Sequence, residues 1–174
     1  MSGGVLVAGI GNIFQTDDAF GVEVAARLST RTLPPGVRVE DFGIRGLHLA
    51  YELLNGYDGL VLIDAVPMGE PAGTLAIIQP EVERTDTPAI DAHTMSPDAV
   101  LASLAGLGGS VEKIFIVGCQ PADLQEGMGL TPAVAAAVDA AVDLCLELVA
   151  DLVADLVAEL VADLVVPIGK GTRS

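Results

Sequence analysis

The sequence predicts a three-layer α/β domain in which helices cover both faces of a mostly parallel, five-stranded sheet. Three observations predict it. Short apolar runs alternate with helical patterns, the runs are bounded by Gly, Pro or Asp, and 51% of the 174 residues are apolar. Alternating strands and helices are typical of parallel sheets, and this apolar content is enough to fill one well-buried core. We therefore expect one α/β domain.

Five segments are expected to be strands because they are short, apolar and rich in β-branched residues. They are residues 5–10, 37–41, 60–64, 74–79 and 113–118. The fourth should run antiparallel to the third if the two pair, because residues 65–73 are too short and broken for the crossover of roughly a dozen residues that parallel neighbours need. The sheet is thus expected to be parallel except at its fourth strand.

Helices are expected between and after these strands, where apolar residues recur at helical spacing. The segments are residues 19–30, 47–54 and 97–104. Thr131, followed by Pro132, is expected to cap a long C-terminal helix.

The long helix is expected to run into a tandem repeat of Leu-Val-Ala and an acid. Its carboxylates are Asp151, Asp155, Glu159 and Asp163. A four-residue step overshoots one helical turn by about 40°, so these acids drift around the helix. Carboxylates near the middle of a bilayer oppose insertion, so we expect no membrane span. The repeat is expected to pack on the domain or on another copy of the chain.

These patterns divide the chain into three parts. Residues 1–148 are expected to form the α/β domain, residues 149–166 to extend the last helix through the repeat, and residues 167–174 to form a tail.

Charge and cysteine content narrow the classes of partner and compartment. With 24 acidic and 8 basic residues, the net charge of −16 repels nucleic acid and anionic lipid. The two cysteines, Cys119 and Cys145, have neither disulfide nor zinc-site spacing. No targeting segment precedes the first strand, so the expected location is the cytoplasm.

The first strand–helix turn resembles a dinucleotide-binding loop only at its beginning. Residues 9–12 read Gly-Ile-Gly-Asn, but Phe14 replaces the third glycine of the fingerprint. Asp17 and Asp18 would repel a pyrophosphate at the helix N-terminus. The acids at residues 40–41 still match a ribose-binding position, so nucleotide binding stays open as an alternative.

A divalent-metal site is the second interpretation of the same edge of the sheet. Helix capping alone would explain residues 16–18. Asp64, however, ends an apolar strand, and a lone buried carboxylate is costly unless it is paired or metal-bound. His93 precedes the next helix and can reach this edge, although an exposed loop histidine is the simpler interpretation of His93 alone. An imidazole with two carboxylates suits nickel, zinc or cobalt, so Asp18, Asp64 and His93 are the candidate ligands.

Taken in order, these motifs resemble those of the hydrogenase maturation endopeptidases, which trim the large subunit of nickel-iron hydrogenases. The resemblance covers residues 5 to about 148. The matching segments are residues 9–12, 17–18, 21, 41–46, 63–65, 93, 118–121 and 129–132. It implies that Asp18, Asp64 and His93 hold a metal.

The resemblance also implies the reaction and the source of the metal. The substrate would be a nickel-loaded precursor of the large subunit, whose C-terminal extension is removed by one cut. The nickel would be supplied by this substrate, and zinc, cadmium or another divalent ion could occupy the site in isolated protein.

The implied hydrolysis needs no Ser or Cys nucleophile, and both cysteines are expected to be small buried apolar residues. A metal could polarise the carbonyl or activate water, or Asp41 could act as general base; Asp64 is also a catalytic candidate. The loop after the second strand, with Gly43, Arg45 and Gly46, is implied to bind substrate. At residues 44–45, Ile-Arg replaces the Thr and small residue of several relatives, which indicates a different precursor.

Two further functions remain open. A nickel-binding docking or checkpoint protein would bind the same precursor without cutting it. A metal-dependent peptidase of broad specificity would cut unstructured peptides without nickel.

Overall fold

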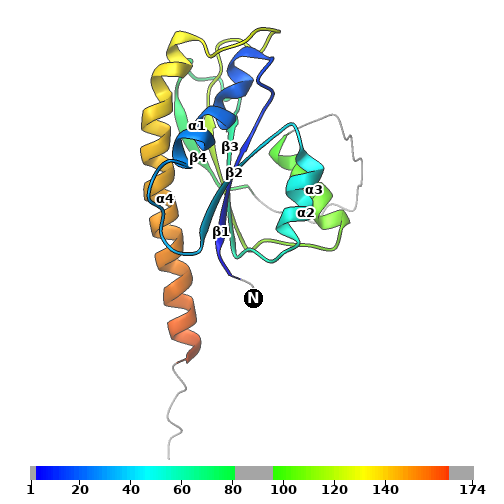
Figure 1. The fold of residues 1–174 in the computed structure, drawn as a ribbon, viewed down its shortest axis with the longest axis vertical. Coiled ribbons are helices and arrows are strands. Elements are labelled where there is room, and N and C mark those ends of the chain that lie inside the picture. Colours follow the sequence, from blue (N-terminus) through cyan, green and yellow to red (C-terminus); the bar gives the residue numbers. More distant parts are fainter. Residues whose placement is uncertain (1–2, 81–95, 165–174) are drawn as a thin grey trace, which may run out of the picture.

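A computed structural model describes residues 3–80 and 96–164 of the chain. A five-stranded sheet lies between two pairs of helices (Figure 1). The strands are β1 (Val5–Ile10), β2 (Val37–Gly43), β3 (Gly59–Ala65), β4 (Leu75–Ile78) and β5 (Lys113–Cys119). The helices are the 3-10 helix η1 (Thr16–Ala19), α1 (Phe20–Leu28), α2 (Gly46–Leu53), α3 (Pro97–Gly106) and α4 (Pro132–Leu164). The predicted three-layer α/β class is confirmed.

The strand order is β2-β1-β3-β5-β4. β2, β1, β3 and β5 run parallel to one another, and β4 is antiparallel to β5. The antiparallel direction of β4 is confirmed; β4 pairs with β5 and not with β3. β5 lies beside β3 and leaves β4 at the edge of the sheet. The fully buried β3 suits an interior position, whereas the short, half-exposed β4 suits an edge.

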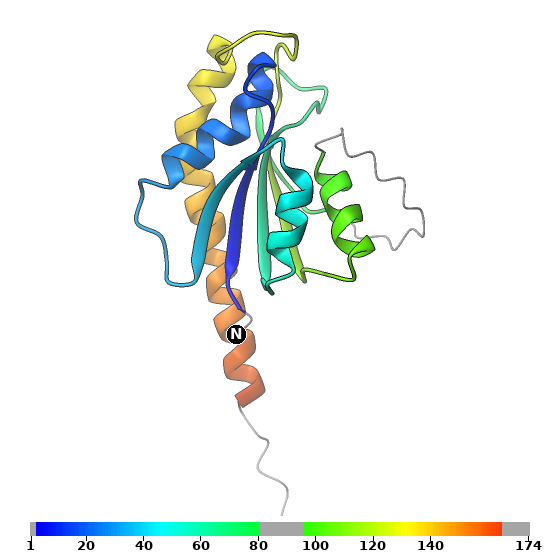
Figure 2. The same ribbon diagram turned by 45° about the vertical axis from the view of Figure 1, so that its right-hand side comes forward.

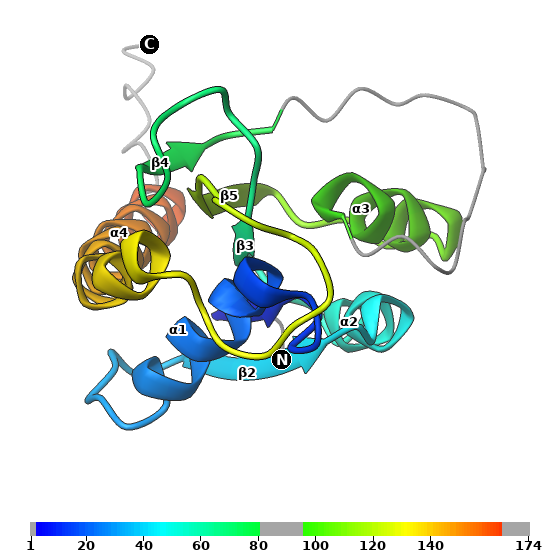
Figure 3. The same cartoon turned by 90° about the horizontal axis from the view of Figure 1, so that it is seen from above.

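Alternate residues of the central strands enter two cores. Val5 and Val7 of β1 pack with α1 and α4, whereas Leu6 and Ala8 pack with α2 and α3. This follows from the opposite directions of successive strand side chains. Seen from above, the two helix pairs lie on opposite faces of the sheet (Figure 3).

Gly21 brings α1 against the sheet. A Cβ atom at this position would overlap the carbonyl oxygens of Ile10 and Ile63, so only glycine allows this approach. The contact fixes the start of α1, and with it η1, over the carboxyl ends of β1 and β3.

α4 is 33 residues long and continues through most of the repeat. Val149 and Leu152 are buried, so the start of the repeat packs on the domain, and Lys113 Nζ pairs with Glu159 Oε1 at 2.6 Å further along. The last turns extend beyond the sheet (Figures 1 and 2). Within the described residues, no helix is both long and apolar enough to cross a membrane.

Candidate active site

Asp18 is held in the loop that follows β1. Its Oδ2 accepts a hydrogen bond of 2.8 Å from the backbone N–H of Asn12. The loop folds back tightly at Gly11, whose φ is +140° and whose missing Cβ would overlap the Asp18 carbonyl oxygen. Burial raises the pKa of Asp18, although the Asn12 hydrogen bond opposes this change. The glycine motif therefore serves to place a carboxylate.

Asp64 is the most unusual charged residue of the described chain. It lies near the end of β3, is 5% exposed, and its Oδ1 has no hydrogen-bond partner among the described residues. Burial raises the pKa of Asp64 to about 8; the negative charge of Asp18 adds to this, and the Ala65 backbone N–H opposes it. Asp18 and Asp64 thus interact electrostatically, as the sequence predicted for neighbouring ligands.

A bound proton or a divalent cation would offset the negative charge of this pair. An unpartnered, buried carboxylate oxygen beside a second carboxylate is costly unless a cation compensates it. The third predicted ligand, His93, lies outside the described residues. Among residues 3–80 and 96–164, no group of three or more His, Cys, Asp or Glu is placed to hold a metal. The three-residue metal site therefore stays a prediction.

Asp17, the neighbour of Asp18, has a different role that sequence reasoning missed. It is fully buried and accepts hydrogen bonds from the backbone N–H groups of Ala122 (2.8 Å), Asp123 (3.0 Å) and Thr131 (2.8 Å). The hydroxyl of Thr131 lies 2.8 Å and 2.9 Å from its two oxygens. Burial raises the pKa of Asp17, but these hydrogen bonds outweigh it and leave the pKa lowered.

The predicted position of Thr131 before the last helix is confirmed: α4 begins at Pro132, and the Thr131 carbonyl accepts a hydrogen bond of 2.8 Å from Ala135 N–H. The Thr131 hydroxyl contacts the Asp17 carboxylate. At the first loop, η1 begins after Gln15 without a side-chain cap, so helix capping does not explain residues 16–18. The sequence contained one signal for the contact between Asp17 and Thr131, namely that both belong to the motifs of the resemblance. It did not indicate that the two residues contact each other.

The segment that Asp17 binds wraps the first loop. Thr16 N–H donates to the Gly127 carbonyl at 3.0 Å, and Gly127 N–H donates back to Phe14 at 2.9 Å. Thr16 has a φ of +51°, and its hydroxyl donates to the Gln125 carbonyl at 2.7 Å. The strained residue is thus held from both sides, which fixes the loop that carries Asp18.

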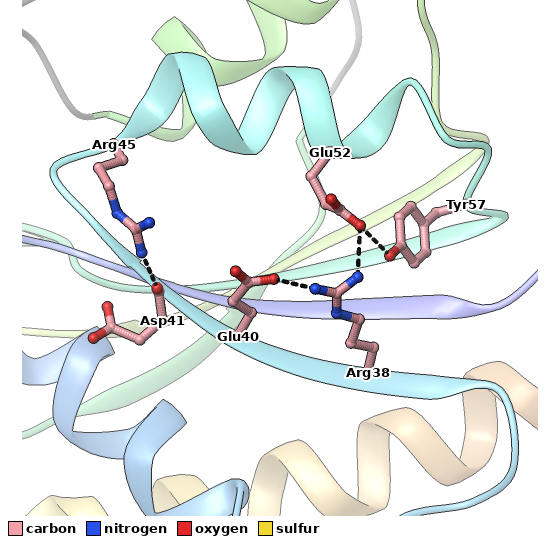
Figure 4. A network of polar contacts seen from close by, with 6 residues as sticks. All are labelled: Arg38, Glu40, Asp41, Arg45, Glu52 and Tyr57. Carbon is pink, nitrogen blue, oxygen red and sulfur yellow. Dashed lines mark hydrogen bonds and ion pairs between the residues drawn. The ribbon is translucent and has the colours of Figure 1, made fainter.

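Asp41 lies on β2, beside Gly9 of the neighbouring strand β1 and close to the carboxyl end of that strand. Its carboxylate is exposed and accepts a hydrogen bond of 2.8 Å from Gly43 N–H. Arg45 donates to the carbonyl oxygens of Asp41 (2.6 Å) and Phe42 (3.2 Å), as Figure 4 shows for Asp41. Arg45 therefore braces the carboxyl end of β2, which carries Asp41, and the loop that follows it.

A cavity of about 300 Å³ separates this loop from the first one. Its lining comprises Gly11, Asn12, Ile13, Phe14, Val22, Asp41, Phe42, Gly43, Ile44 and Arg45. Phe14 and Ile44 are 59% and 61% exposed, so its rim is apolar. Asp18 and Asp64 are not among its lining residues, but Asn12 lines it and donates to Asp18. Of the predicted substrate-binding residues, Gly43 and Arg45 line the cavity, whereas Gly46 begins α2 outside that lining.

Cys119 and Cys145 are fully buried, as expected. Burial raises the pKa of Cys119 to about 11, with a further contribution from Asp17, and raises that of Cys145 to about 12. Both thiols therefore stay protonated and are poor nucleophiles.

Comparison with known proteins agrees with this arrangement. A family model described as hydrogenase maturation protease matches residues 22–148. The chain is 36% identical to the hydrogenase 2 maturation protease of Escherichia coli (strain K12) over 76% of the chain and 82% of that protein. It is 35% identical to the hydrogenase expression/formation protein HupD of Rhodobacter capsulatus over 75% of the chain, and spans 64% of the length of HupD.

The fold agrees as well. The structure of the hydrogenase maturating endopeptidase HybD from E. coli superimposes with a TM-score of 0.69 and 32% identity, over 85% of this chain and 93% of HybD. The repeat at residues 149–166 lies beyond the residues that the family model matches. The chain belongs to the hydrogenase maturation protease family.

Proposed function

We propose that this chain is an endopeptidase that removes the C-terminal extension of a nickel-loaded precursor of a nickel-iron hydrogenase large subunit. One observation carries the proposal at the level of the site: the unpartnered Oδ1 of buried Asp64 beside Asp18. The family membership supports the same reaction. The nickel is part of the substrate and need not be a resident cofactor.

Asp18, Asp64 and His93 are the proposed contacts to the substrate nickel. Asp64 binds a cation after it loses the proton that its raised pKa favours, so binding releases a proton. In isolated protein, zinc, cadmium or another divalent ion can take the same place, because oxygen and imidazole ligands accept several such ions. The contribution of Asp64 to catalysis is then to anchor the substrate beside the scissile bond.

The cavity beside this pair is the proposed peptide site. Phe14 and Ile44 offer apolar walls, and Gly43 and Arg45 offer the backbone and charge of the opposite loop. Gly46 supports this loop from the start of α2. Asn12 joins the two sites, because it lines the cavity and binds Asp18.

Asp41 is the proposed general base. Its Oδ1 accepts a hydrogen bond from Gly43 N–H, whereas its other oxygen accepts no hydrogen bond from the described residues. It would take a proton from water as the water oxygen bonds to the scissile carbonyl carbon; the C–N bond then breaks, and Asp41 passes that proton to the leaving amine. No Ser or Cys nucleophile is required.

We also propose where the protein acts and how it assembles. The reaction takes place in the cytoplasm, and the chain self-associates through α4.

The test is incubation with a nickel-loaded precursor, followed by intact mass of its C-terminus and by a pull-down. Asp64→Asn and His93→Ala should lose both binding and cleavage of the precursor. Asp41→Asn should still bind the precursor but cleave it more slowly. Asp143→Asn, an exposed acid on α4, is the matched control. Binding without cleavage by wild type would favour the docking or checkpoint protein, and cleavage of short peptides without nickel would favour the broad peptidase.

A further inference from the structure

The last turns of α4 carry an exposed apolar stripe, defined as Val157, Leu160, Val161 and Leu164. These side chains are 53%, 63%, 54% and 78% exposed. Their spacing is i, i+3, i+4 and i+7, which places all four on one face of the helix. The last turns of α4, which carry this face, extend past the sheet (Figures 1 and 2). A contiguous exposed apolar face of this kind marks an interaction surface.

The charges of the same turns lie away from the apolar stripe. At about 100° per residue, Asp155, Glu159 and Asp163 lie at least about 110° from its centre. Glu159 in addition pairs with Lys113 of the domain, so its side of α4 is turned toward the chain's own sheet. The stripe therefore offers no charge to an ionic partner. The carboxylates of these turns stay outside a helix–helix contact made through the stripe.

We propose that the apolar stripe packs against the same stripe of a second copy of the chain, antiparallel and about a two-fold axis. Such an interface is self-complementary. The spacing of the stripe is symmetric about its centre, so Val157 of one copy faces Leu164 of the other, and Leu160 faces Val161. A net charge of −16 disfavours an anionic membrane as the occupant.

The size and place of the stripe set the properties of this dimer. It spans eight residues, or about 12 Å of helix. Four side chains on a helical face of this length bury far less area than the roughly 1,600 Å² of a standard interface. The dimer is weak and depends on concentration. Salt strengthens it by screening the charge on each copy. The candidate active site lies at the carboxyl ends of the parallel strands, away from these turns, so both sites stay open.

Sedimentation of the full chain from micromolar to millimolar concentration tests the proposal. The mass of wild type should rise from 17.7 kDa toward twice that value. Leu160→Glu should lower the association constant at least tenfold, whereas Ala162→Glu, with the same added charge on the opposite face, should leave it unchanged. Far-UV circular dichroism checks that both variants keep α4.

A cross-link tests the antiparallel register. An equimolar mixture of Leu160→Cys and Val161→Cys should form a covalent dimer with a short bis-maleimide, because the two native cysteines are buried. Ala162→Cys alone should not. A wild type that stays monomeric, an Ala162→Glu as dissociated as Leu160→Glu, or a monomer that binds phosphatidylcholine vesicles through the stripe would each overturn the proposal. Precursor processing by Leu160→Glu should be unchanged, so this test is independent of the proposed function.

Discussion

Replacing Asp64 by Asn should make the stability of the metal-free protein less dependent on pH. Burial and the charge of Asp18 raise the pKa of Asp64 from 3.8 to about 8. Between these values the folded chain keeps a proton that the unfolded chain releases. The free energy of unfolding therefore falls as pH rises through this window.

The size of the effect follows from the pKa change. At about 1.4 kcal/mol per unit, Asp64 lowers the free energy of unfolding by roughly 4 kcal/mol at neutral pH and by roughly 6 kcal/mol well above pH 8. Asn cannot ionise, so Asp64→Asn should lack this loss. Its advantage over wild type should grow from about pH 4 to about pH 8 and then level off.

Urea unfolding of protein dialysed against a chelator, at several pH values across this window, measures the difference. Asp18→Asn should end the decline of stability at a lower pH and make it smaller, because removing a negative charge lowers the pKa of folded Asp64. Asp143→Asn, which is exposed, should match wild type. If the free energy of unfolding of wild type and of Asp64→Asn changed with pH in parallel, the reasoning would be refuted, because the pKa of Asp64 would then not be raised in the folded protein.

Three further changes have defined outcomes. Asp17→Asn should lower the free energy of unfolding by about 3–5 kcal/mol, because an amide cannot accept all the hydrogen bonds that reach the buried carboxylate. The difference should narrow at acid pH, as wild type loses the contribution when pH falls through the lowered pKa; a loss below about 1 kcal/mol would contradict this account. Gly21→Ala should cost about 1–3 kcal/mol or more by pushing α1 off the sheet, measured by thermal unfolding, and an unchanged melting temperature would contradict the close packing. Arg45→Lys should raise KM for the precursor several-fold at unchanged kcat, because the ammonium group of Lys lacks the planar fork with which two nitrogens of Arg45 reach two carbonyl oxygens; an unchanged KM would remove the bracing role.

The strands were readable because their signals are local. β1 was predicted with the bounds that it has, since an apolar run of six residues stands between polar or glycine-rich segments. The antiparallel direction of β4 followed from the length and composition of the link before it. The strand with which β4 pairs could not be predicted in this way, because the position of β4 depends on where β5 pairs, about forty residues later in the chain.

The candidate site divides in the same way. Asp64 was readable because a charged residue at the end of a fully apolar strand is anomalous by itself. Asp17 and Asp18 are adjacent and chemically identical, yet one binds a distant backbone segment and the other faces Asp64. Only the path of residues 120–131 separates their roles, and no local pattern encodes that path.

The most direct test of the central claim compares two forms of one precursor with wild-type protein. A nickel-loaded and a nickel-free hydrogenase large-subunit precursor are incubated in parallel, and the C-terminus of each is followed by intact mass. The account predicts loss of one defined C-terminal peptide from the nickel-loaded form alone. Equal cleavage of both forms, or no cleavage of a nickel-loaded precursor that the protein binds, would contradict it.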